Sequence, residues 1–111
     1  MRKITINREK AFAACLMKVR FYVTDPSGTD TNIHGYPCRK LFDLKNGEAN
    51  TAEIPETECA IYAIIDEVSK EFCNGSIILP AGKADISVHG KNKLSPLKGN
   101  PFVFSSEITV I

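Results

Sequence analysis

The stretch that decides the fold runs from Met17 to Thr24 and reads MKVRFYVT. Apolar residues occupy every second position along it, and a period of two is typical of a β-strand with one buried face. The predicted inward face holds Met17, Val19, Phe21 and Val23, and the outward face holds Lys18, Arg20, Tyr22 and Thr24. We therefore expect a β-protein.

Other short segments extend this pattern on both sides. Arg2 to Asn7 alternates strictly, with Ile4 and Ile6 on one face. Further strands are predicted at residues 38–44, 49–54, 59–65, 76–79, 84–89, 102–104 and 108–111. Residues 59–65 are apolar throughout, which indicates a buried central strand and leaves helix as the competing interpretation.

Turn residues separate these segments. Asp25-Pro26-Ser27-Gly28 ends the strongest strand and begins a polar loop that runs to about Pro37. Asn46-Gly47 stands between two extended runs, and a tight hairpin turn favours this dipeptide because both central residues need a positive φ. We therefore expect the strands at 38–44 and 49–54 to pair antiparallel.

The spacing of the turns defines the fold class. They recur every eight to twelve residues or so, and no long helical period is present, which favours a sandwich over an α/β layer. The prediction is one domain over residues 1–111, all-β, folded as an antiparallel β-sandwich of about seven to nine short strands. A short helix near 66–73 is left open, since that segment has helical composition.

Composition narrows the function classes. The chain has 111 residues and a net charge of +1, so no long-range field favours nucleic acid or an anionic membrane. Apolar runs such as Ala11 to Leu16 are far shorter than the roughly 20 residues that cross a bilayer. Polar residues follow the basic N-terminus where a signal peptide needs its apolar region. We expect a cytoplasmic protein that has no membrane partner.

Three motifs together resemble a known kind of module. They are ITINREKAFAACLMKVRFYV at 4–23, LKNGE at 44–48 and LPAGK at 79–83. The order resembles small β-sandwich modules of Gram-positive bacteria whose function is uncharacterised. The resemblance implies a small β-sandwich and supplies no catalytic residues. This chain departs from the compact pattern by an inserted loop at about 25–36 and by a longer tail after Lys91.

The four cysteines allow three interpretations. They are Cys15, Cys38, Cys59 and Cys73, and none forms a C-x-x-C pair of the kind that zinc sites use. His34 and Cys38 are the nearest candidates for a metal site or a Cys/His enzyme. A disulfide between Cys59 and Cys73 is the second interpretation, and burial of the thiols as small apolar groups is the third.

Signatures of common enzymes are absent from the sequence. It contains no G-x-S-x-G, no phosphate-binding loop and no dinucleotide fingerprint, so neither catalytic residues nor a cofactor are predicted. Nucleic-acid binding remains an alternative through Lys18, Arg20 and Tyr22, since such sheets combine cations with a stacking ring. A small-molecule ligand cannot be specified from these residues.

The leading hypothesis is a non-enzymatic interaction module. Exposed sheet edges pair readily with other chains, and long loops are often functional, so we expect binding through an edge or through the loop Gly90 to Pro101. A protein partner or self-association would both fit. The candidate surface residues are Lys18, Arg20, Tyr22, Lys91, Lys93 and Lys98.

Overall fold

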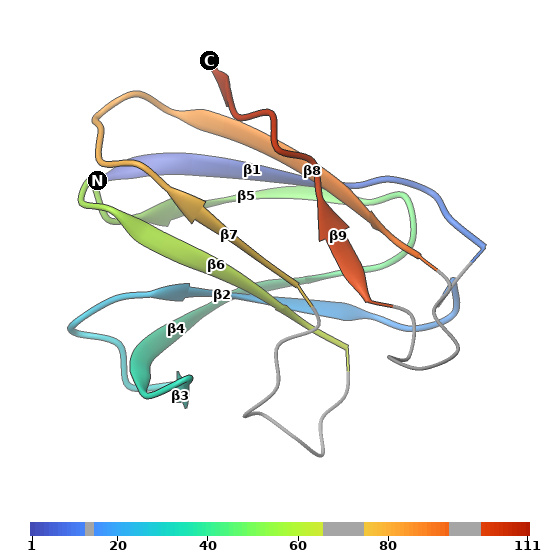
Figure 1. Cartoon of the computed structure of the whole chain (residues 1–111), viewed down its shortest axis with the longest axis horizontal. Helices are drawn as coiled ribbons and strands as arrows, with labels where there is room; N and C mark the ends of the chain where they lie inside the picture. Colours follow the sequence, from blue (N-terminus) through green and yellow to red (C-terminus); the bar gives the residue numbers. More distant parts are fainter. Residues whose placement is uncertain (13–14, 66–74, 94–100) are drawn as a thin grey trace.

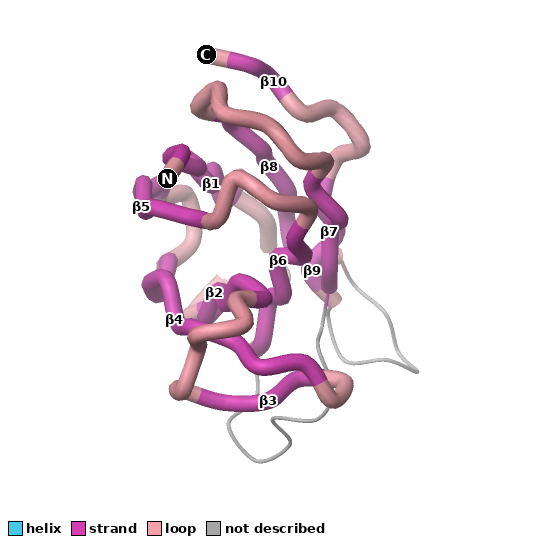
Figure 2. Tube along the Cα trace, turned by 90° about the vertical axis from the view of Figure 1, so that its left-hand side faces the viewer, coloured by secondary structure: helices cyan, strands magenta, loops and turns pink. Residues whose placement is uncertain are grey.

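Alternating side chains build two β-sheets that pack face to face (Figures 1 and 2). The structure is a computed structural model that describes residues 1–12, 15–65, 75–93 and 101–111. These residues form strands and turns and contain no helix, which confirms the all-β prediction. The helix considered at 66–73 lies outside the described residues.

The first sheet has the order β10-β8-β1-β5, and β9 also pairs with β8. Its strands are β1 (Arg2–Arg8), β5 (Ala49–Ile54), β8 (Ile86–Asn92), β9 (Phe102–Phe104) and β10 (Thr109–Val110). The second sheet has the order β3-β4-β2-β6-β7. Its strands are β2 (Val19–Thr24), β3 (Thr31–Ile33), β4 (Tyr36–Leu44), β6 (Cys59–Ile64) and β7 (Gly75–Leu79).

The inward faces of both sheets form one apolar core. Val19, Phe21 and Val23 of β2 are fully buried, as the alternation predicts. Phe21 meets Phe102 of the other sheet edge-to-face, with ring centroids 5.3 Å apart. The strand at 59–65 is also confirmed, because β6 lies between β2 and β7. Met17, predicted to face inward, is instead exposed because β2 begins only at Val19.

The prediction of a hairpin at Asn46-Gly47 is wrong. β4 pairs with β2 and β3, whereas β5 pairs with β1, so the turn carries the chain from one sheet to the other. Only Gly47 has a positive φ, and a tight hairpin turn needs this at both central residues. The Asn46 side chain instead accepts a hydrogen bond from the Ala11 backbone N–H at 3.0 Å.

A two-residue hairpin lies inside the predicted polar loop at 25–36. His34 and Gly35 have φ values of 52° and 82°, the signs that a type I′ turn requires, and they join β3 to β4. His tolerates this conformation better than most residues, but His-Gly is a weaker signal than Asn-Gly. β3 therefore adds a strand to those predicted, which gives ten among the described residues.

Two further details of the prediction change. β1 and β8 pair in parallel, whereas every other pairing among the described residues is antiparallel. Parallel neighbours need a long connection, and the chain that connects β1 to β8 contains all the strands of the second sheet. β8 also continues to Asn92 and pairs with β9, so the first part of the predicted loop 90–101 is strand.

Two buried arginines lie at the ends of the core. Arg2 and Arg8 lie on the same face of β1 as its isoleucines, and both are buried. Arg8 donates to the carbonyls of Met17 (2.7 Å) and Leu44 (2.8 Å), and so ties β1 to the other sheet. Arg2 donates to the carbonyl of Pro55 at 3.0 Å. The inward face of β1 thus has a buried cation at each end of the strand.

Candidate functional site

A hollow of about 540 Å³ lies on the outer face of the second sheet. Its lining consists of Thr24, Asp25, Pro26, Tyr36, Pro37, Thr57, Glu58, Cys59, Ala60, Tyr62, Ser76 and Ile78. The register between β6 and β7 places Tyr62 opposite Ser76 and Ala60 opposite Ile78. The small residues Ala60 and Ser76 thus lie between larger neighbours, which leaves an open depression. We call it the outer groove.

The wall of the outer groove depends on the β3–β4 hairpin. Ile33 and Cys38 pack with Tyr22, Tyr62 and Ile64 in a second small core on the outside of the sheet. The His34 ring lies against Tyr62, with centroids 5.6 Å apart. This packing anchors the hairpin beside the groove. Tyr36, which follows the turn, stays 59% exposed.

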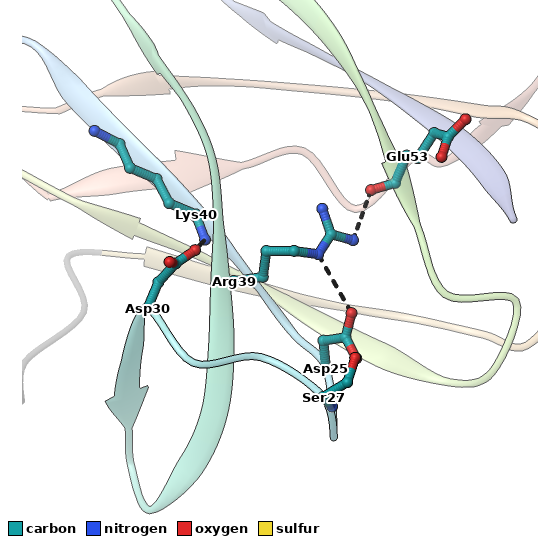
Figure 3. A network of polar contacts seen from close by, with 6 residues as sticks. All are labelled: Asp25, Ser27, Asp30, Arg39, Lys40 and Glu53. Carbon is teal, nitrogen blue, oxygen red and sulfur yellow. Dashed lines mark hydrogen bonds and ion pairs between the residues drawn. The ribbon is translucent and has the colours of Figure 1, made fainter.

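Asp25, which belongs to the groove lining, is a structural carboxylate held by a network of polar contacts (Figure 3). One oxygen accepts from the Ser27 backbone N–H (3.0 Å) and hydroxyl (2.8 Å), and the other lies 3.3 Å from Nε of Arg39. These donors, the Ser27 N–H above all, lower the pKa of Asp25. Asp25 is therefore ionised at neutral pH, and its oxygens are already occupied.

The same network protects two strand edges (Figure 3). Arg39 donates through Nη2 to the backbone carbonyl of Glu53 on β5 at 2.9 Å. The Asp30 carboxylate accepts from the backbone N–H of Lys40 on β4 at 2.8 Å. Side chains thus occupy backbone groups that another chain could bind, a common way to prevent edge pairing.

β7 is the edge strand that adjoins the outer groove. It has five residues, against three in β3, three in β9 and two in β10, whereas the six-residue edge β5 has its Glu53 carbonyl occupied by Arg39. β9 crosses its start, where a Cβ on Gly75 would lie 1.9 Å from the Phe102 carbonyl oxygen. β7 ends the order of its sheet, and β9 of the other sheet packs against part of it. Ile78 is 67% exposed.

None of the predicted surface residues that the structure describes lines this groove. Lys18, Lys91 and Lys93 are exposed, Arg20 is half-buried, and Lys98 lies outside the described residues. Arg8 bonds both the Met17 carbonyl and the Asn92 side chain, so the segments that carry Lys18, Lys91 and Lys93 meet at one end of the sandwich. Tyr22 is only 5% exposed and has no ring face for a nucleic-acid base.

The Cys38 and His34 positions have structural roles. Cys38 is fully buried and donates through Sγ to the Tyr36 carbonyl at 3.4 Å. Burial raises the pKa of this thiol, which disfavours the thiolate that catalysis or metal binding needs. His34 forms the hairpin turn. No group of three metal-ligating side chains occurs among the described residues.

The other cysteines divide into buried and partly exposed thiols. Cys15, Cys38 and Cys59 are free, and Cys73 lies outside the described residues. Cys59 is buried, as the third interpretation expects, and burial raises the pKa of its thiol. Cys15 is half-buried.

Comparison with known proteins adds no family to these observations. No protein-family model matches the chain, and no curated protein matches it. The resemblance to small modules of Gram-positive bacteria stays a prediction. Over the ranges that the structure describes, no helix is long and apolar enough to cross a bilayer.

Proposed function

We propose that this domain is a non-enzymatic interaction module that binds an extended segment of a protein partner along β7. The segment would add a strand to the second sheet and place alternate side chains over the outer groove. The observation that carries this proposal is the position of Ser76 and Ile78, which belong both to the β7 edge and to the groove lining. Strand addition at an exposed edge is a recurring mode of peptide recognition.

The register of β7 determines how the two features cooperate. Ser76 and Ile78 point to the outer face, because they pair with Tyr62 and Ala60, which also line the groove. Side chains of an added strand alternate between faces, so every second one would follow Ser76 and Ile78. Main-chain hydrogen bonds would supply affinity, and the groove would select among side chains.

The size of the open edge predicts a weak, transient complex. β9 lies against part of β7, so fewer than its five residues are open for pairing. A strand paired over so few residues makes only a few hydrogen bonds, each worth about 1 kcal/mol net. We expect dissociation constants of micromolar or weaker, as is common for interfaces below about 1,200 Å².

Selection of displayed peptides on the folded chain tests the proposal. The probe is a library of random 12-residue peptides, and binders are synthesised for titration by chemical-shift perturbation. We expect shifts at the amides of Ile77 to Leu79, and at least tenfold weaker binding for Ile78→Lys, which puts a charge on the edge. The matched control is Val103→Lys, at an exposed site on β9.

Methylation of the peptide backbone separates strand addition from contact by side chains alone. A methyl group on every second amide removes hydrogen-bond donors while the side chains remain, so binding should be lost in one of the two alternate methylation patterns. The proposal fails if no peptide is selected, or if binders ignore both Ile78→Lys and methylation. Sedimentation of the unliganded chain addresses self-association, since a β7-to-β7 dimer would also dissociate in Ile78→Lys.

A further inference from the structure

We infer that the outer groove accepts a positively charged side chain, so that the segment bound along β7 carries a lysine or an arginine over Tyr36 and Glu58. This inference rests on the proposed function and adds the chemistry of the partner to it. Two features of the lining support it: its acidic side chains and the exposed ring of Tyr36.

The charge of the lining is negative. Asp25 and Glu58 belong to it, and among the described residues it contains no lysine, arginine or histidine, although the buried Arg2 donates to the carbonyl of Thr57 in the same lining at 3.2 Å. Arg39 offsets Asp25, because its Nε lies 3.3 Å from that carboxylate. Glu58 is exposed, lies at the start of β6 and forms no ion pair within the described part of the chain. Glu58 is therefore the carboxylate that a cation from a partner can reach.

The hydrogen-bonding groups of the lining are compatible with a donor. Pro26 and Pro37 have no N–H, and the Pro37 carbonyl already accepts from the Asp25 backbone N–H at 3.0 Å. The Thr24 hydroxyl already accepts from the Ala60 backbone N–H at 2.9 Å. Hydroxyls such as that of Ser76 can accept from a lysine or an arginine, but they can also donate, so the preference for a cation comes from the charge of the lining.

Tyr36 supplies a ring face to the same lining. It is 59% exposed, although the buried residues Ile33 and Cys38 anchor the β3–β4 hairpin on either side of the turn. A cation over an aromatic face is attracted by the negative potential of the ring. The aliphatic part of a lysine or arginine would cover the apolar surface of Ile78, and its charged end would remain near Glu58.

The peptide selection described above also tests this inference. Binders should be enriched in lysine or arginine at one position whose side chain faces the groove. Replacing that residue by an uncharged isostere, citrulline for arginine or norleucine for lysine, should weaken binding about tenfold. Glu58→Gln should weaken the cationic peptide about fivefold, as expected for a partly exposed ion pair, and leave the neutral peptide unchanged. Glu107→Gln, at an exposed acid outside the lining, is the control.

Tyr36→Leu separates the ring from the apolar contact. It keeps an apolar side chain, so selective loss of the cationic peptide would identify the aromatic face. The inference is overturned if selected binders are neutral or acidic, or if charged and uncharged peptides bind equally to the unchanged protein. The proposed function survives those results when Ile78→Lys still abolishes binding. If no peptide binds, both are rejected.

Discussion

Replacement of Arg8 by methionine gives the sharpest test of how the two sheets are held together. Arg8 is 1% exposed and donates to the carbonyls of Met17 and Leu44 and to Oδ1 of Asn92. Methionine keeps most of the apolar stem and removes the guanidinium. The loss therefore falls on the acceptors, of which the Leu44 carbonyl and Oδ1 of Asn92 are buried and the Met17 carbonyl is partly buried.

The magnitude follows from those acceptors. A buried acceptor left without a donor costs about 1–3 kcal/mol, so the Leu44 carbonyl and Oδ1 of Asn92 give a gross loss of about 2–6 kcal/mol. Removing a buried charge recovers part of this, because burial disfavours the charged guanidinium and lowers the pKa of Arg8. We expect a net loss of about 3 kcal/mol, a large share of the roughly 5–15 kcal/mol that stabilises a small domain.

Urea unfolding followed by circular dichroism measures this effect. With a slope of about 1.5 kcal/mol per molar, typical of small domains, the midpoint should fall by about 2 M. Lys3→Met is the control, since Lys3 is exposed on the opposite face of β1 and should change stability by less than about 0.5 kcal/mol. A loss below about 1 kcal/mol for Arg8→Met would refute the role of Arg8 as a link between the sheets.

Three further predictions concern glycine, charge and thiols. Gly75→Ala should lower the free energy of unfolding in urea by about 1–3 kcal/mol, because the new Cβ would meet the Phe102 carbonyl oxygen. Gly82→Ala is the control and should be nearly neutral, since its Cβ would meet only an Arg2 nitrogen at 3.5 Å. Equal effects of the two substitutions would contradict the close approach of β7 and β9. Asp25 has a folded pKa below its ordinary value of 3.8, so its contribution is present above that pH and is lost as the pH falls through the lower folded pKa. Asp25→Asn should therefore cost about 1–2 kcal/mol at pH 7, and this difference from the unchanged protein should shrink near pH 2; a pH-independent difference would exclude ionisation as its cause. In a Cys73→Ser background, a thiol reagent should modify Cys15 about a hundredfold faster than Cys38 and Cys59, which become reactive only when the fold opens. A rapid reaction at Cys38 would support the Cys38 and His34 hypothesis instead.

The strands were predictable because burial of one face produces an alternation of apolar and polar residues that is visible in a short stretch of sequence. The inward residues of β2 recur at every second position, and the solid apolar stretch of β6 reflects its central place in the sheet. This local pattern does not show which strands pair with one another. The strands flanking Asn46-Gly47 have the composition of a hairpin, yet they belong to different sheets because β2 and β1 supply the neighbours that each strand pairs with.

The outer groove was missed for a related reason. Its floor comes from β2, β6 and β7, and its wall comes from the hairpin at His34-Gly35. The sequence predicts only a polar loop where this hairpin lies. Tyr22 shows the same effect, since it was predicted to be exposed and is instead covered by Ile33 and Cys38. A residue on the outward face of a strand becomes buried or exposed according to what another segment places over it.

The sequence by itself determined that this chain forms short strands with alternating faces, because that property depends only on neighbouring residues. Which strands pair, where two arginines end the core, and which edge stays open were decided by the tertiary structure. Those features depend on contacts between residues far apart in the chain, such as Arg8 with Leu44 and Arg39 with Glu53, and no local period encodes them.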